Sequence, residues 1–509
     1  MATTAPSTLL DLLAAGRDAD PAVLAPDRPP LSFAGLRALV REVAGALRAR
    51  GIGPEDRVAI VLPNGPEAAT AFLAVACAAA TAPLNPAYRE EELDFYLDDL
   101  KAKAVLVTAE EKGPAVAVAA KRGMQLVRLE VPAGAEAGRF SLGTAAAVEP
   151  TPSPEATALL LHTSGTTSRP KLVPLSHANL VASARHIGTT LALAPGDRCL
   201  NVMPLFHIHG LVAAVLSSLA AGGSVFCTPG FNALRFFAWL EEARPTWYTA
   251  VPTMHQAILA RAERNPEAVA RAELRLIRSS SASLPPQVMR ALETTFRCPV
   301  IESYGMTEAA HQMTSNPLPP ARRKPGSVGL PAGPLVRIAD PSAPVLRGPG
   351  ETGEVVISGP NVTKGYEANP EANAKAFFEA EGRRWFRTGD EGFFDEDGYL
   401  RLTGRLKEII NRGGEKVSPL EVDEVLMDHP AIAQCVTFAI PHEKLGEEVG
   451  AAVVLREGMT ATEQEIRAFA ATRLADFKVP RKVVILPEIP KGATGKLQRI
   501  GLAQRLGLA

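Results

Sequence analysis

Short apolar runs alternate with longer stretches rich in alanine and leucine over residues 1–404. Val58–Leu62 and Ala104–Val107 have the length and composition of buried strands, whereas Phe33–Arg48 is long enough for a helix. Strands that alternate with helices in this way are typical of α/β proteins with parallel sheets. The pattern therefore predicts a large N-terminal region of several subdomains with mostly parallel sheets, in which Glu149–Pro154 is a proline-rich linker.

A smaller α+β unit is predicted at the C-terminal end, over residues 405–509. Strands are expected at Tyr399–Thr403, Glu408–Asn411 and Lys482–Leu486, with a turn at Gly413-Gly414. Ser418, followed three residues later by Glu421, has the spacing of a capping box and predicts helix Leu420–Met427. A second pair of this kind predicts a further helix: Thr462 with Glu465, and helix Glu463–Leu474.

The composition narrows the class of function. With 46% hydrophobic and 21% charged residues and a net charge of −1, the 509-residue chain has no overall attraction to nucleic acid or anionic lipid. The apolar run Ala71–Ala82 is too short to cross a bilayer, and five scattered cysteines suit a reducing compartment. We expect a cytoplasmic protein that binds small molecules, without a nucleic-acid or membrane partner. The sequence does not indicate the oligomeric state.

A loop dense in hydroxyl groups follows the apolar run Ala156–Leu161. Its sequence from His162 to Lys171, H-T-S-G-T-T-S-R-P-K, suits a polyphosphate, because hydroxyls and backbone amides donate hydrogen bonds and the lysine adds charge. Pro170-Lys171-Leu172 rules out a Walker A loop, and a solvated surface turn is the alternative interpretation. The residues expected to bind ATP here are Thr163, Ser164, Gly165, Thr166, Thr167 and Lys171.

This loop resembles the signature loop of the adenylate-forming superfamily, which includes acyl-CoA synthetases, peptide-synthetase adenylation domains and beetle luciferases. Tyr304-Gly-Met-Thr-Glu308 is similar to the nucleotide segment of that family. The resemblance implies that Tyr304 packs on adenine, Thr307 bonds phosphate and Glu308 holds Mg²⁺. It also implies nucleotide contacts for Ala282 and Ser283, in the segment Ser279–Leu284 where serines replace the glycines usual in the family, and for Glu302 and Ser303 just before Tyr304.

Three more segments extend the resemblance toward the C-terminus. It implies that Asp390 binds the ribose hydroxyls, with Arg405 near the ribose and Lys407 at a hinge. Lys496, in Gly492-Ala-Thr-Gly-Lys, is the predicted catalytic residue, because a cation that bridges carboxylate and α-phosphate stabilises the transition state. Gly413 and Gly414 are assigned to the CoA half-reaction, after a rotation of the C-terminal domain. Taken singly, Asp390, Arg405 and Lys496 would be interpreted as surface charges.

The segments expected to line the acid pocket carry polar groups. His207 and His209 lie in Leu205–Gly210, Ser281 lies beside the adenine segment, and His311 follows Glu308 by three residues. A second carboxylate on the substrate would demand such donors, because a buried unpaired anion is costly. Five stretches resemble the oxalate–CoA ligase family: Thr81–Tyr88, Thr163–Arg169, Thr246–Pro252, His311 with Ser315-Asn-Pro317, and Pro360–Gly365. The resemblance implies that His207 or His209, Ser281 and His311 hold oxalate, and His207 is also assigned a catalytic role. A gate or core histidine is the alternative, above all for His207.

The resemblance thus implies a ligase that uses ATP, Mg²⁺ and coenzyme A. Residues 1–404 would bind ATP and the acid, and the mobile domain 405–509 would supply the catalytic lysine and complete the CoA half-reaction. A small carboxylic acid, most specifically oxalate, would be joined to AMP with loss of pyrophosphate and then passed to CoA. Three alternatives are a ligase for another small, medium-chain or aryl acid, an enzyme that loads a carrier protein, and a non-catalytic nucleotide sensor.

Overall fold

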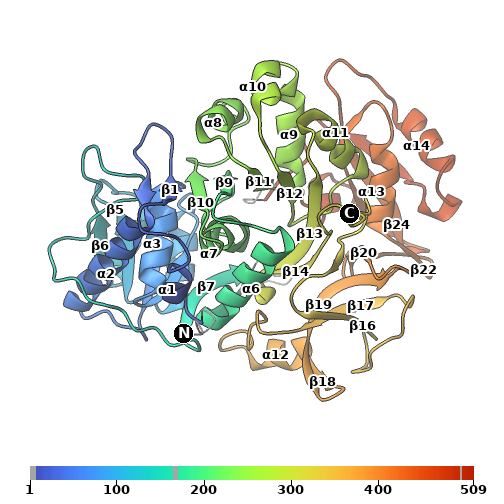
Figure 1. Cartoon of the computed structure of the whole chain (residues 1–509). Coiled ribbons are helices and arrows are strands. Elements are labelled where there is room, and N and C mark those ends of the chain that lie inside the picture. Colours follow the sequence, from blue (N-terminus) through green and yellow to red (C-terminus); the bar gives the residue numbers. More distant parts are fainter. Residues whose placement is uncertain (1–6, 164–169, 493–495) are drawn as a thin grey trace.

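The computed structural model describes residues 7–163, 170–492 and 496–509. In these ranges the strands assemble into four sheets, with helices packed between and around them (Figure 1). Two sheets are largely parallel, and a small α+β unit closes the chain, which confirms the predicted fold class. In the same ranges no helix is both long and apolar enough to cross a membrane.

The first sheet carries the hydroxyl-rich loop at its edge. Its strands run in the order β6-β5-β3-β4-β7-β8, and only β8 is antiparallel to its neighbour. The predicted strands and helix are present and shifted by no more than about two residues. The elements are β3 Arg57–Ile60, β4 Ala80–Pro83, β5 Ala104–Thr108, β6 Gln125–Leu129, β7 Thr157–Thr163, β8 Lys171–Ser176, α2 Phe33–Ala49, α3 Pro66–Ala76, α4 Glu90–Leu100 and α5 Pro114–Lys121.

The second sheet follows the order β15-β14-β13-β12-β11-β9-β10-β1-β2, with parallel pairing from β1 to β13. Its strands are β1 Pro21–Leu24, β2 Leu31–Ser32, β9 Arg198–Asn201, β10 Ser224–Cys227, β11 Trp247–Ala250, β12 Leu276–Ser279, β13 Val300–Met306, β14 His311–Ser315 and β15 Leu330–Pro331. Its helices are α1 Leu9–Leu12, α6 His177–Thr190, a π-helix His209–Leu216, α7 Ser217–Ala220, α8 Phe236–Ala243, α9 Pro252–Ala262, α10 Pro266–Arg271 and α11 Pro286–Phe296.

A third, antiparallel sheet joins these layers to the C-terminal unit. The general alternation of strands and helices did not single it out, because antiparallel neighbours need only short turns and no crossover helix. Its order is β16-β17-β19-β18, and β20 pairs with β19. The strand expected at Tyr399–Thr403 in the C-terminal unit is β20, which belongs to this sheet instead, because its backbone pairs with β19. The elements are β16 Leu335–Ala339, β17 Gly353–Ser358, α12 Pro370–Ala376, β18 Phe377–Ala380, β19 Arg383–Phe394 and β20 Leu400–Arg405.

The C-terminal unit has its own sheet and its own apolar core. Thr462 and Glu465 form the predicted reciprocal capping box of α14. At α13 only half of the predicted box is present: Ser418 accepts from the Glu421 amide, but the Glu421 carboxylate accepts from Lys478 Nζ at 2.7 Å, because an ion pair competes for it. The elements are β21 Ile410–Arg412, β22 Glu415–Val417, α13 Pro419–Met427, β23 Ile432–His442, β24 Gly446–Leu455, α14 Glu463–Ala471, β25 Lys482–Ile485 and α15 Leu502–Arg505.

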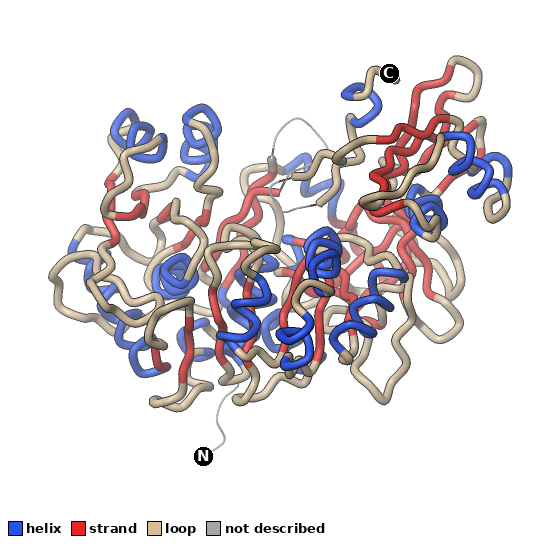
Figure 2. Tube along the Cα trace, turned by 90° about the horizontal axis from the view of Figure 1, so that it is seen from above, coloured by secondary structure: helices blue, strands red, loops and turns tan. Residues whose placement is uncertain are grey.

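The C-terminal unit lies at one end of the molecule, beside α9 and α11 (Figure 1). In the view from above, the C-terminus lies toward that same end (Figure 2). Gln256 of α9 donates to the Ala433 carbonyl at 3.1 Å, and Gln287 of α11 donates to the Asp428 carboxylate. These contacts hold the unit over the carboxyl ends of β11 and β12, where the candidate residues of the site also lie.

Candidate active site

Two buried histidines form a polar cluster near the carboxyl ends of β11 and β12. His209 opens the π-helix, a helix form often found at functional sites. Its Nδ1 lies 2.9 Å from Ser281 Oγ and its Nε2 lies 2.6 Å from Thr249 Oγ1. Burial lowers the pKa of His209 well below its ordinary value, so the ring is neutral at neutral pH.

His311 lies against this pair, with its ring centroid 5.0 Å from that of His209. It is buried and has a φ of 104°, and Ser281 has a φ of 74°. Residues other than glycine rarely adopt such angles, and the strain gathers at binding and catalytic sites. Burial also lowers the pKa of His311 well below its ordinary value. The cluster therefore consists of two neutral, buried imidazoles and a hydroxyl that are held close together.

Gly305 is required for the backbone path of His311. A Cβ at position 305 would overlap the carbonyl oxygen of His311, across the β13–β14 hairpin. Gly305→Ala should therefore lower the free energy of unfolding by about 1–3 kcal/mol, as overpacking does. Gly188→Ala in α6 is the matched control, because a Cβ there meets no atom within 4 Å, and it should be neutral or stabilising. Chemical denaturation of both variants measures the difference, and equal stabilities would contradict the claim.

The residues assigned to the nucleotide lie side by side. The Tyr304 hydroxyl donates to the Asp390 carboxylate, and Arg405 Nε lies 3.3 Å from Asp390 Oδ1. Glu302 is buried, which raises its pKa to about 8, and its Oε1 accepts from the Leu284 amide at 2.8 Å. This bond holds the segment that contains Ala282 and Ser283. Ser280 Oγ in turn donates to the Ser303 carbonyl at 2.9 Å, tying β12 to β13.

Glu308 occupies the short turn Thr307–Ala309, next to Lys171 and Tyr366. The Tyr366 hydroxyl donates to Glu308 Oε1 at 2.8 Å, and Lys171 Nζ lies 4.4 Å from the centre of the Tyr366 ring. Thr163 Oγ1 lies 3.5 Å from the Lys171 carbonyl oxygen, so the two ends of the hydroxyl-rich loop lie together. The other residues predicted to bind ATP in this loop lie outside the described residues: Ser164, Gly165, Thr166 and Thr167.

Lys496 extends from the C-terminal unit into the space between the domains. Its surroundings desolvate the amine and Arg405 repels it, which together lower its pKa to about 8, while Asp390 acts in the opposite direction. The residue keeps an exposed surface toward a cavity of about 200 Å³ that Ala282 and Ser283 also line. The pKa of the half-buried His207 is lowered to about 4, mainly by burial and further by the positive charge of Lys496. The structure thus places the tail amine beside the nucleotide segment.

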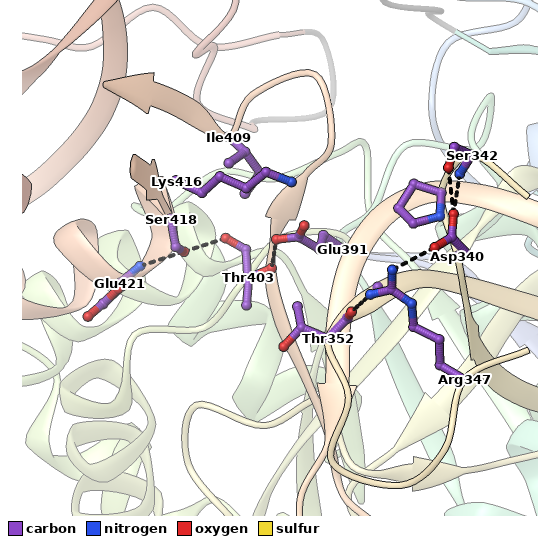
Figure 3. Close-up of a pocket in the computed structure, with 12 residues that line it drawn as sticks. Asp340, Ser342, Arg347, Thr352, Glu391, Thr403, Ile409, Lys416, Ser418 and Glu421 are labelled. Atoms are coloured by element: carbon purple, nitrogen blue, oxygen red, sulfur yellow. Dashed lines mark hydrogen bonds and ion pairs between the residues drawn. The ribbon is translucent and has the colours of Figure 1, made fainter. Parts of the chain in front are cut away.

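The residues assigned to the hinge and to the CoA half-reaction lie in two turns of the chain. Lys407 is exposed between β20 and β21, and Gly413 and Gly414, with φ of 61° and 97°, make the turn between β21 and β22. A cleft of about 600 Å³, lined by Ile409 and Lys416 among others, opens between the antiparallel sheet and the C-terminal unit (Figure 3). Ser418 donates across it to the Thr403 carbonyl. The hinge and CoA roles stay predictions.

Three residues of the site were not predicted as site residues from the sequence: Thr249, Arg278 and Tyr366. Thr249 anchors His209, Arg278 lies 3.4 Å from His311, and Tyr366 holds Glu308. Their proximity in the sequence to assigned segments could have indicated two of them. Arg278 directly precedes the serine-rich segment, and Tyr366 directly follows Pro360–Gly365.

Comparison with known proteins matches this arrangement. The family described as AMP-binding enzyme matches residues 13–367, and its C-terminal domain matches residues 421–496. Oxalate–CoA ligase of Arabidopsis thaliana is 47% identical over 94% of this chain and 96% of its own, and that of Saccharomyces cerevisiae is 43% identical over 88% and 87%. The crystal structure of ATP-bound MatB from Rhodopseudomonas palustris superposes with a TM-score of 0.88 at 32% identity, covering 98% of each chain.

A nucleotide site between a large α/β region and a small C-terminal domain defines the class of adenylate-forming enzymes. The chain belongs to the AMP-binding enzyme family.

Proposed function

We propose that this enzyme is an ATP-dependent acid–CoA ligase whose acid is oxalate. The observation that carries the choice of acid is the buried cluster of His209, Ser281 and His311. A hydrocarbon chain gains nothing from these polar groups, whereas a second carboxylate can accept hydrogen bonds from imidazole and hydroxyl donors. The likeness to two oxalate–CoA ligases over most of the chain supports the same substrate.

The reaction proceeds in two steps at one site. One carboxylate oxygen of the acid attacks the α-phosphorus of ATP, a P–O bond forms, and pyrophosphate leaves. The sulfur of CoA then attacks the acyl carbon, the thiol proton is lost, and AMP leaves with its oxygen. Lys496 stabilises the charge that builds up between carboxylate and phosphate in the first step. We place the reaction in the cytoplasm, where the five buried free cysteines stay reduced.

Mg²⁺ fits the residues around Glu308. The carboxylate is a hard oxygen ligand held in place by Tyr366, and among the described residues no group of three or more His, Cys, Asp or Glu forms a metal cage. Magnesium that acts with nucleotides is typically bound by one or two carboxylates together with phosphate oxygens. When bound, the ion would neutralise phosphate charge, and Glu308 would be its ligand from this chain.

A panel of acids tests the substrate. The purified enzyme is supplied with ATP, Mg²⁺ and CoA, and AMP release is measured with oxalate, malonate, a medium-chain fatty acid and 4-coumarate. We expect the highest kcat/KM with oxalate. A higher value with any other acid would refute oxalate and leave the reaction class intact. Saturable turnover with CoA alone would separate the ligase from an enzyme that loads a carrier protein.

The pKa of Lys496 predicts how the rate depends on pH. Only the protonated amine stabilises the transition state, and its pKa is lowered to about 8. The kcat/KM for adenylate formation should therefore be constant as pH rises to about 8 and then fall about tenfold per unit. Lys496→Arg keeps a cation at all these pH values, so its lower rate should not fall above pH 8. A fall that persists in Lys496→Arg would assign it to another group, such as Glu302.

A further inference from the structure

Arg278 carries a charge in the interior of the second sheet. It lies within β12 and is fully buried. Its Nε and Nη1 have no hydrogen-bond partner among the described residues, and in that part of the chain no carboxylate forms an ion pair with it. Its Nη2 has two long contacts, 3.4 Å to His311 Nδ1 and 3.3 Å to Gln312 Oε1. A buried guanidinium without a counter-charge is costly, and a stably folded protein usually keeps one only for a purpose.

The sheet register places this charge behind the cluster of His209, Ser281 and His311. Arg278 is the Cα partner of Thr249 on β11, so the two side chains share one face of the sheet. Thr249 binds His209, and Arg278 contacts His311. After burial, the positive charge of Arg278 is the largest cause that lowers the pKa of both histidines. The guanidinium and the two imidazoles therefore act on one another electrostatically.

Arg278 carries a positive charge, whereas the two histidines beside it are neutral. Burial lowers the pKa of Arg278 to about 9, which still leaves the guanidinium protonated at neutral pH. The histidines are neutral, so they can donate hydrogen bonds but bring no charge. Lys496 faces the nucleotide and the reacting end of the acid. A dianionic substrate therefore needs one more positive charge at its far end, and Arg278 is the buried cation placed behind that end.

We propose that Arg278 is the specificity-determining residue for a second carboxylate, acting as its counter-charge from behind His209 and His311. The inference rests on the proposed function. An acid with a neutral tail would leave the guanidinium without compensation, so the pocket selects against it as well as for a dianion. Arg278 is a positioning residue here, because it acts on the substrate through the histidines and through its field.

Oxalate and oxamate test this directly, because oxamate has the shape of oxalate with a neutral amide in place of one carboxylate. Adenylate formation is measured with each acid as pyrophosphate release. Arg278→Met should lower kcat/KM for oxalate about 50-fold, because it removes the buried counter-charge of the second carboxylate, and should change kcat/KM for oxamate less than about threefold. Arg278→Lys keeps the charge and should keep most of the oxalate preference.

Arg275→Gln is the matched control. Arg275 lies just before β12 and pairs with Asp197 at 2.9 Å, away from His209 and His311. Its loss should therefore change kcat/KM for oxalate and for oxamate by the same factor. Thermal unfolding of every variant separates stability from selectivity. Should Arg278→Met not fold, Arg278→Lys decides, because loss of the oxalate preference in a folded Lys variant overturns the role of charge.

The outcomes distinguish this inference from the function on which it rests. Wild-type enzyme that does not prefer oxalate to oxamate refutes the proposed substrate. Wild-type enzyme that prefers oxalate, together with an Arg278→Met variant that retains the preference within threefold, refutes Arg278 alone. A preference lost in Arg278→Met and retained in Arg278→Lys supports it.

Discussion

Lys496→Ala should lower the rate of adenylate formation by about 1,000-fold and leave ATP binding nearly unchanged. The carboxylate and the α-phosphate are both anions, and the amine beside Asp390 and Arg405 is the cation that the C-terminal unit brings to them. Removing a positively charged or hydrogen-bonding group that acts only on the transition state typically costs 100-fold or more. ATP has other contacts in the N-terminal region, so its affinity should survive.

Single-turnover pyrophosphate release measures the rate, and calorimetric titration measures ATP affinity. Lys491→Ala is the matched control, since Lys491 belongs to the same segment and its Nζ pairs with Glu488 at 3.0 Å on the surface. It should retain the wild-type rate. A Lys496→Ala enzyme as fast as the control would show that the tail lysine takes no part in the first step.

Local signals predicted most of the fold. Apolar runs marked β3, β5 and β7, and the pair of Thr462 and Glu465 marked the start of α14, because each depends on residues only a few positions apart. Contiguous motifs likewise named Tyr304, Asp390 and Lys496, which the structure brings together. The division of the chain at residue 405 and the motion of its second part stay predictions.

What the sequence did not predict depends on pairings between distant segments. The Glu421 side chain leaves its capping box for Lys478, 57 positions away, and no local pattern reveals that competitor. Arg278 acquires its meaning only from strand register, which sets it beside Thr249 and behind His311. Tyr366 is similar, since its hydroxyl reaches Glu308, 58 positions away in the sequence.

His311→Leu should lower kcat/KM for oxalate by about 1,000-fold and leave the KM for ATP within a few-fold of wild type. Leucine fills much of the space of imidazole but has no donor, so the second carboxylate would lose a hydrogen bond in a buried site, a loss of 2–5 kcal/mol or more. The buried His311 ring, at the start of β14, lies against His209 and Arg278. Oxamate, whose tail is neutral, should lose much less.

His255→Leu is the control for this change. His255 is also a fully buried, neutral histidine, but its Nδ1 lies 3.2 Å from the Tyr248 hydroxyl, in the apolar core between α9 and β11. Its replacement should alter the melting temperature and leave the ratio of oxalate to oxamate kcat/KM unchanged. If His311→Leu changes only stability, as the control does, then His311 supports the hairpin and the carboxylate has another partner. An oxalate-to-oxamate ratio that falls in His311→Leu alone shows that His311 recognises the second carboxylate. The strained backbone at Ala310 and His311, with a φ of 104° at His311, then serves to hold this hydrogen-bond donor in place.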